Sequence, residues 1–164
     1  MARNGNGNRG KPNTRIFGLQ YEEAPTVDMF AGEFLIASHP AYVLIDMIAT
    51  HSCMSEHFMH VCGLSAENIP DLAICINTPV GPNCMMTRIV ISVDVLVENL
   101  HMPVDMLILP MSNFDIILDM NWLNQYQVTI DCYNAILSFK LSEEGEAEYR
   151  MIRQRPITMP IKDL

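Results

Sequence analysis

Aromatic residues are scarce in this chain of 164 residues, at 7% of the sequence, although apolar residues make up 49%. The core of a single ordinary domain must therefore be built mainly from Ile, Val, Leu and the 13 methionines. Long apolar runs are also missing: none reaches membrane-spanning length, and no apolar stretch follows the basic N-terminus. We therefore expect no membrane span, no signal peptide and a cytoplasmic location.

Basic residues are few outside the N-terminus. The chain has 10 basic and 19 acidic residues, and residues 1–15 carry basic residues but no acid. The remaining body repels nucleic-acid phosphates, so we expect at most weak RNA contact, made by the N-terminal tail. The Gly- and Asn-rich composition of this end predicts a disordered basic linker over residues 1–28.

The five cysteines are an odd number and do not have the pattern of a disulfide framework, so we expect reduced, mostly buried thiols. A zinc site is an alternative, because one short segment holds His51, Cys53, His57, His60 and Cys62. Their spacing is not that of a standard zinc knuckle, and a helix with its histidines in solvent explains them more simply. We predict no metal and no cofactor.

Short apolar segments separated by turn residues dominate residues 29–141. They predict an all-β barrel or sandwich, because too little chain separates the strands for the crossover helices of an α/β fold. After residue 141 the sequence turns acidic and then rich in Arg and Pro, which predicts a C-terminal tail over 142–164. The predicted helices are 55–64 and 120–126, and the predicted strands lie within 31–45, 72–77, 85–97, 103–110, 114–118, 128–132 and 135–140.

The stretch VLIDMIATHS places Asp46 directly after an apolar run. An acid at the end of a buried strand needs a hydrogen-bonding partner or a function. One interpretation is a turn or helix cap, in which the carboxylate accepts hydrogen bonds from nearby backbone amides. The other is one half of a catalytic carboxylate pair, with one member acting as base and the other as acid. A chain with one such loop obtains its second carboxylate by dimerising.

Two segments match the motifs of one protease family. Residues 39–58, HPAYVLIDMIATHSCMSEHF, share with the pattern D-S-G-A-T-H-S-F-I-S the residues Asp46, Ala49, Thr50, His51, Ser52 and Ser55. Residues 114–132, FDIILDMNWLNQYQVTIDC, share with F-D-V-I-L-G-M-D-W-L-x-x-Y-x-A-x-I-D-C the residues Phe114, Asp115, Ile117, Leu118, Met120, Trp122, Leu123, Tyr126, Ile130, Asp131 and Cys132. The chain thereby resembles the retropepsin-like aspartic proteases of gypsy-type LTR retrotransposon gag-pol polyproteins, over residues 16–140.

The resemblance implies a fold, an activity and a partner. The family fold is a retropepsin-like closed β-barrel with one or two short helices, and two copies form a homodimer. Each copy supplies one catalytic aspartate, here Asp46, which activates a water for peptide-bond hydrolysis in a peptide or polyprotein substrate. A β-hairpin flap covers the substrate, and it falls here near residues 77–90.

The active-site loop departs from the family directly after Asp46. Met47 replaces a Ser or Thr whose hydroxyl hydrogen-bonds across the dimer, and a thioether donates no hydrogen bond. Ile48 replaces a glycine that lets the backbone pass close to the carboxylate. Ala49 and Thr50 keep the family residues. Two functions therefore stay open: an aspartic endopeptidase impaired by these changes, or an inactive remnant that acts as a dimerisation or peptide-binding module.

Asp119 is a third departure, at a position where the family has glycine. A carboxylate there is costly if it is buried and unpaired. Because VLID and IILD share one pattern, a further alternative is a single-chain protease in which Asp46 and Asp119 form the catalytic pair. On this reasoning Asp119→Gly removes the activity of a single-chain enzyme, whereas a dimeric enzyme gains stability or activity.

Overall fold

The N-terminal part of the fold is a tight β-hairpin. In the computed structural model, which describes residues 29–78, 81–141 and 145–154, the hairpin consists of β1 (Met29–Ile36) and β2 (His39–Asp46). Its turn residues, Ala37 and Ser38, have φ angles of 46° and 67°. Positive φ at both positions is typical of the two-residue turns that match the twist of antiparallel strands. The predicted hairpin is confirmed. The linker expected over residues 1–28 lies outside the described residues.

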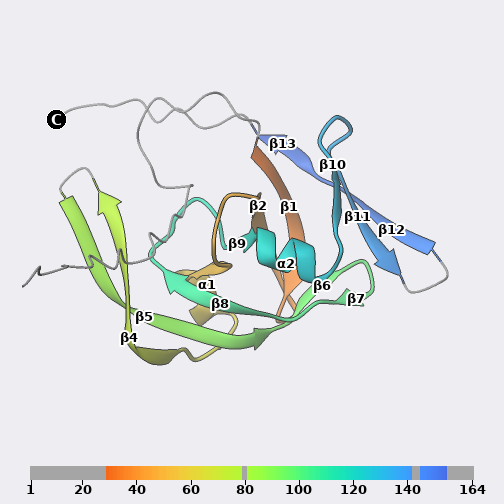
Figure 1. Cartoon of the computed structure of the whole chain (residues 1–164). Coiled ribbons are helices and arrows are strands. Elements are labelled where there is room, and N and C mark those ends of the chain that lie inside the picture. Colours follow the sequence, from red (N-terminus) through yellow and green to blue (C-terminus); the bar gives the residue numbers. More distant parts are fainter. Residues whose placement is uncertain (1–28, 79–80, 142–144, 155–164) are drawn as a thin grey trace, which may run out of the picture.

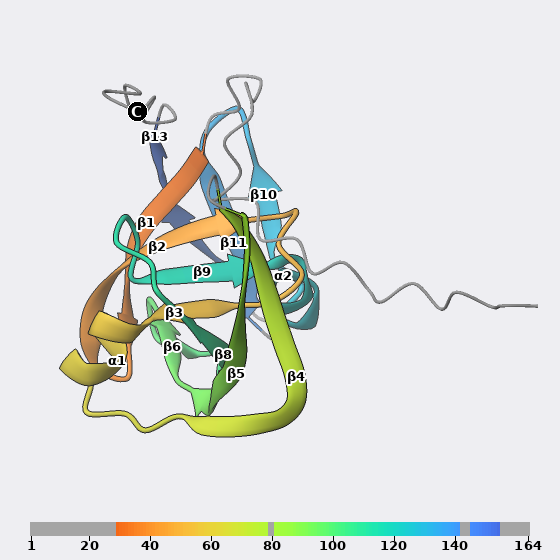
Figure 2. The ribbon, with the colours of Figure 1, turned by 90° about the vertical axis from the view of Figure 1, so that its left-hand side faces the viewer.

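The centre of the fold brings together three strands that are far apart in the sequence. After β2 the chain loops to β3 (Cys53–Ser55), yet β9 (Ile116–Asp119) lies between these two strands (Figure 2). It runs parallel to β2 and antiparallel to β3. The last pair of the parallel ladder is Asp46 opposite Asp119. The chain therefore places the ends of both Asp-containing strands side by side.

A long hairpin projects from one end of the molecule (Figure 1). It is formed by β4 (Glu67–Thr78) and β5 (Gly81–Val93), and Thr78 faces Gly81 across the turn. This position agrees with the flap expected near residues 77–90. The long strand or bent pair expected over 85–97 is a bent pair: Ser92 has a φ of 54°, the pairing register shifts there, and β6 (Val95–Val97) follows. β7 (Leu100–His101) and β8 (Val104–Leu109) come next.

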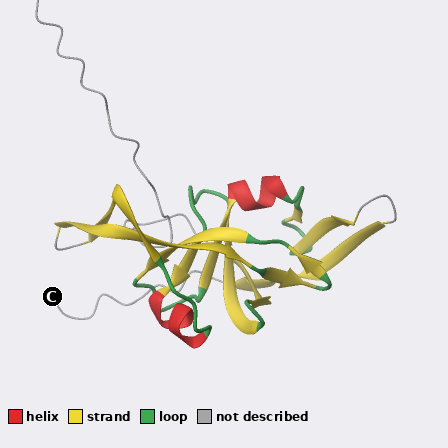
Figure 3. Cartoon of the chain, turned by 90° about the horizontal axis from the view of Figure 1, so that it is seen from below, coloured by secondary structure: helices red, strands yellow, loops and turns green. Residues whose placement is uncertain are grey.

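The two predicted helices are present, and they lie on opposite sides of the strands (Figure 3). Helix α1 (Glu56–Val61) begins at Ser55, whose side chain accepts a hydrogen bond from the Phe58 amide at 3.1 Å. Gly63, with a φ of 65°, follows the helix in the left-handed conformation that glycine adopts without strain. Helix α2 (Met120–Gln125) begins at Asp119.

Strand pairing continues past residue 141, where the sequence predicts a tail. A second sheet contains β10 (Thr129–Asp131), β11 (Ile136–Leu141) and β12 (Gly145–Arg150), and β13 (Ile152–Gln154) pairs with β1. The hydroxyl of Tyr149 accepts from the Glu33 amide at 2.9 Å and donates to the Glu33 carbonyl at 3.0 Å. The predicted boundary at residue 141 thus separates β11 from its own partner β12.

The architecture is all-β with two short helices, as expected for a retropepsin-like domain. The main sheet has ten strands in the order β4-β5-β8-β3-β9-β2-β1-β6-β7, with β13 beside β1. Among the described strands its two ends do not pair, so the expected closure into a barrel is not seen there. The core consists mainly of Ile, Val, Leu and Met. It also contains Trp122 and Phe139, whose ring centroids lie 6.2 Å apart in an edge-to-face contact. No helix in the described part is long and apolar enough to span a membrane.

Candidate active site

Asp46 lies where the buried strand β2 ends, and its carboxylate organises the loop that follows. Its Oδ1 atom accepts hydrogen bonds from the amide of Ile48 at 2.9 Å and from the amide of Ala49 at 3.1 Å. This is the local turn geometry that aspartate favours, and no helix follows it. Because Oδ1 takes both bonds, Oδ2 is the atom available to an external group.

The active-site loop exposes its two unusual residues and buries the next one. Met47 is 42% exposed and Ile48 is 59% exposed, whereas Ala49 is 3% exposed. Thr50 is exposed and its hydroxyl lies 2.9 Å from Nδ1 of His51. In this single chain the apolar side chains of Met47 and Ile48 therefore stand in solvent directly beside the carboxylate. Met120, which follows Asp119, is another exposed apolar residue at 39%.

Asp119 is buried, and it has hydrogen-bond partners. It is 3% exposed, and its Oδ1 accepts from the Ser52 hydroxyl at 2.8 Å and from the Trp122 amide at 3.1 Å. The Asp119 amide donates in turn to the Ser52 oxygen at 3.1 Å. Asp119 is thus the N-cap of α2 and the partner of Ser52 in the active-site segment. The capping role can be predicted from the sequence, because an Asp directly precedes a predicted helix. The contact with Ser52 cannot, because no local pattern links the two residues.

Both carboxylates act on one buried thiol. Cys53 is fully buried, and burial, followed by the negative charges of Asp119 and Asp46, raises the pKa of Cys53 to about 12. The effect of both acids on Cys53 agrees with their facing positions at the ends of β2 and β9. Cys53 is therefore a packing residue and not a nucleophile.

The zinc alternative finds no support in this segment. His57 and His60 are exposed on α1, and Cys53 is buried away from them in β3. The thiol of Cys62 donates to the carbonyl of Ile36 at 3.8 Å. In the part of the chain that the structure describes, no three His, Cys, Asp or Glu side chains form a group that could hold a metal ion.

A hollow of about 490 Å³ lies beside the active-site loop. Its walls include Thr50, His51 and Ser52 from that loop, residues of β5 and β8, and the start of α2. Asp119 lines it, whereas Asp46 does not. Asn121 links two of its walls, because its side-chain amide donates to the Thr50 carbonyl at 3.3 Å.

The chain matches a known protein family in sequence and solved structures in fold. The family model described as retroviral aspartyl protease matches residues 12–145. No curated protein sequence matches the chain. Among solved structures, the retroviral protease-like domain of Ddi1 from Leishmania major superposes with a TM-score of 0.55 at 15% identity, covering 84% of this chain and 99% of that one. The EIAV protease complexed with the inhibitor HBY-793 superposes with a TM-score of 0.48 at 17% identity, covering 69% of this chain and 99% of that one. The family match covers both the Asp46 loop and the Asp119 segment, and the chain belongs to the retroviral aspartyl protease family.

Proposed function

We propose that this chain is a retrotransposon-type aspartic endopeptidase domain that processes a gag-pol polyprotein as a homodimer in the cytoplasm. The observation that carries the proposal is the position of Asp46, at the end of a buried strand with one oxygen fixed by two backbone amides. Such a carboxylate is held in one orientation before any substrate arrives. Membership of the retroviral aspartyl protease family supports the choice of reaction.

In the proposed reaction the two Asp46 residues of a dimer share one proton. The ionised carboxylate takes a proton from a water, and the water oxygen forms a bond to the peptide carbonyl carbon. The protonated carboxylate gives its proton to the carbonyl oxygen. As the carbon–nitrogen bond breaks, the carboxyl group that took the water's proton gives it to the leaving nitrogen. The other carboxylate takes a proton back from a hydroxyl on the carbon, which yields a carboxylic acid and an amine and restores the shared proton.

Dimerisation would cover the exposed loop. Met47, Ile48 and Met120 are apolar and exposed in the single chain, and each lies within two positions of one of the two aspartates in sequence. Removal of apolar surface from water favours association by about 25 cal/mol per Å². The proposed contact is therefore made by apolar side chains. It lacks the hydrogen bond across the dimer that the family's Ser or Thr makes at the position of Met47.

The second candidate function is a non-catalytic dimerisation or peptide-binding module. The exposed Met47 and Ile48 favour it, because they put bulk beside the carboxylate where the family has a small hydroxyl residue and glycine. A peptide could still add as a strand to the hairpin of β4 and β5 without being cleaved.

Incubation with a peptide library at mildly acidic pH separates the two functions. Cleavage by the native chain that disappears in Asp46→Asn supports the endopeptidase. No cleavage by the native chain, together with cleavage by the Met47→Ser, Ile48→Gly double variant, supports the inactive module. The double variant is expected to be at least about tenfold faster than the native chain, because ~1.4 kcal/mol of barrier suffices for that factor.

A further inference from the structure

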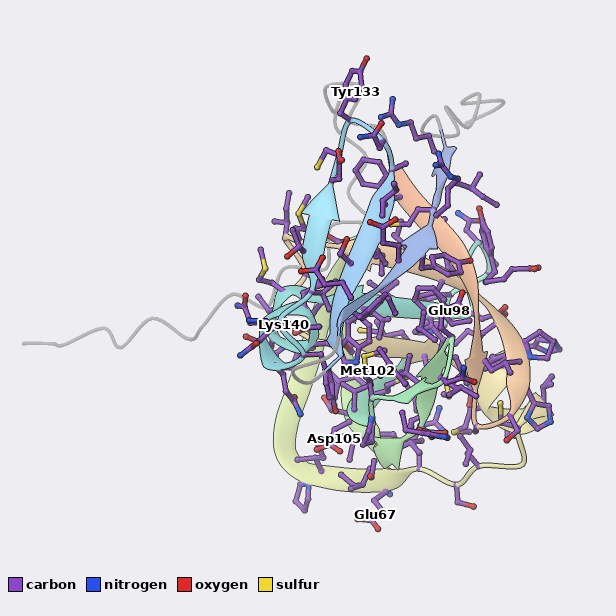
Figure 4. The ribbon with its side chains drawn as sticks, turned by 90° about the vertical axis from the view of Figure 1, so that its right-hand side faces the viewer. Glu67, Glu98, Met102, Asp105, Tyr133 and Lys140 are labelled. Atoms are coloured by element: carbon purple, nitrogen blue, oxygen red, sulfur yellow. The ribbon has the colours of Figure 1, made fainter. Side chains whose placement is uncertain are left out.

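The hollow beside the active-site loop has an uneven distribution of charge. Two carboxylates line it, Asp119 on the inside and the exposed Asp105 of β8, whereas no Lys or Arg is among the described residues that line it. Asp105 is held in place because its Oδ1 accepts from the Ser92 amide at 2.8 Å. Figure 4 shows Asp105 below α2 in the view. The hollow therefore favours a positively charged group.

Apolar side chains complete the walls of the hollow. The lining includes Trp122, which is 1% exposed, and also Leu107 and Ile89. A lysine or arginine side chain has this dual character, since an apolar stem carries a charged end. The lining thus offers apolar contact for the stem and carboxylate oxygens for the end.

The structural role of Asp119 accounts for only one of its oxygens. Both hydrogen bonds that it accepts, from Ser52 and Trp122, go to Oδ1. Among the described residues no hydrogen bond reaches Oδ2. Asp119 lines the hollow, so its carboxyl group borders the open space. An uncharged Asn or Ser caps a helix as well as Asp does, so the cap does not explain a carboxylate that is 97% buried without a cation.

We propose that this hollow binds the basic side chain, lysine or arginine, of an extended peptide. The charged end donates to Oδ2 of Asp119, with Asp105 as a second acceptor, and the stem packs against Trp122 and Leu107. The active-site loop forms one wall of the hollow. Asp119 and Asp46 are paired on neighbouring strands, whose backbones lie about 4.8 Å apart. A peptide lying over Asp46 thus has a side chain within reach of Asp119. That the group belongs to a peptide substrate rests on the proposed function.

A metal ion fits this hollow less well than a basic side chain. A divalent cation needs several oxygen ligands around one point. The described residues hold no group of three carboxylate, His or Cys side chains suited to a metal. One free carboxylate oxygen beside an apolar wall instead matches a single ammonium or guanidinium group.

Binding of N-acetyl-arginine amide to the full chain tests the proposal without requiring catalysis. N-acetyl-citrulline amide is the matched probe, because it keeps the shape of arginine and removes the charge. Titration is followed by NMR at the side-chain amides of Asn121 and Gln125 and at the Trp122 indole, all of which line the hollow. The arginine probe is expected to shift these signals and the citrulline probe to bind at least about tenfold more weakly.

The variants locate the interaction. Asp119→Asn keeps an acceptor for the cap and is expected to weaken arginine binding about tenfold, while Asp105→Asn weakens it less. Glu148→Gln removes an exposed charge on β12 outside the hollow and leaves binding unchanged. Equal binding of the two probes, or Asp119→Asn binding as the native chain does, would overturn the proposal. If Asp119→Asn is misfolded, the comparison of probes on the native chain still decides.

The outcome is separable from that of the proposed function. Asp46→Asn is expected to bind the arginine probe normally, because Asp46 does not line the hollow. Arginine binding without any peptide cleavage removes the endopeptidase and leaves the basic-side-chain site standing. Cleavage without preference for a basic residue at any substrate position removes the site and leaves the endopeptidase standing.

Discussion

Ser52 and Asp119 exchange two hydrogen bonds, at 2.8 Å and 3.1 Å, although 67 positions separate them in the chain. Each is 3% exposed. The pair ties the segment after Asp46 to the start of α2, so the active-site loop and the helix depend on each other. This contact changes what is expected of a substitution at the position where the family has glycine.

Asp119→Gly is expected to destabilise the fold. The substitution replaces the cap of α2 by glycine, at a cost of only about 0.3 kcal/mol, and leaves the buried Ser52 hydroxyl without its acceptor, at a cost of about 1–3 kcal/mol. Urea unfolding gives the free energy, with Asp119→Asn as the control that keeps an acceptor. An Asp119→Gly protein as stable as the native one would refute this account. The expectation from sequence alone, that a dimeric enzyme gains stability or activity from this change, is thereby revised on its stability side.

Gly32→Ala is expected to loosen the C-terminal strands. A Cβ atom at this position would lie 2.8 Å from Cε1 of Tyr149 and 2.9 Å from its hydroxyl. The ring has little room to move, because it packs edge-to-face on Phe34 at 4.8 Å and hydrogen-bonds Glu33. We expect a loss of about 1–3 kcal/mol in the free energy of unfolding.

A double-mutant cycle with Tyr149→Ala isolates this contact. The three atoms nearest to a Cβ at position 32 all belong to Tyr149, so they are absent in Tyr149→Ala. The cost of Gly32→Ala is therefore expected to fall well below its cost in the native background. Equal costs of Gly32→Ala in the two backgrounds would show that the ring is not the obstacle.

The carboxyl group of Asp131 is expected to titrate below the ordinary value for an aspartate. Hydrogen bonds from the backbone and side-chain amides of Asn134, then the Tyr133 amide and the charge of Arg153, lower the pKa of Asp131. Because the pKa is lower in the folded state, this stabilisation is present above the unfolded-state pKa and is lost as the pH falls through the folded-state pKa. NMR titration of the carboxyl carbon measures it.

Asn134→Ala is the matched variant for Asp131. It removes the side-chain donor at 2.7 Å but keeps the backbone amide at 3.0 Å, so the titration midpoint is expected to rise part of the way. A midpoint in the native protein at or above that of an unfolded peptide would contradict the geometry of this turn. Tyr133 lies at the tip of the same hairpin, away from the body of the molecule (Figure 4).

The cysteines are expected to differ in reactivity. Burial, then Asp119 and Asp46, raise the pKa of Cys53 to about 12, whereas Cys132 is exposed. Iodoacetamide at mildly alkaline pH should therefore label Cys132 in the native protein and Cys53 only after unfolding in urea. Peptide mapping by mass spectrometry reads out each site. Labelling of Cys53 as fast as Cys132 in the native protein would mean that the β3 segment opens readily.

The sequence predicts local features of this fold well and distant ones poorly. The hairpin before Asp46 and the two helices have short-range signals in turn residues, caps and periodicity. The sequence predicts a tail at strand β12, because the chain turns acidic after residue 141 and then becomes rich in Arg and Pro. The signal of this strand was the alternation that half-buries Ala147 and Tyr149 while Glu146 and Glu148 stay in solvent. At the site, the position of Asp46 follows from the strand pattern and the resemblance, whereas the Ser52–Asp119 pair depends on the sheet order.

The central claim is that each active site takes one Asp46 from each of two copies, and subunit mixing tests it most directly. Native chain, or the Met47→Ser, Ile48→Gly variant if it is faster, is mixed with its own Asp46→Asn form at constant total protein. Every mixed dimer is then inactive, so peptide cleavage at equal amounts is expected to fall to about one quarter, the square of the active fraction. A fall to about one half, in proportion to the active chains, would show that a single chain carries a complete site and would contradict the account.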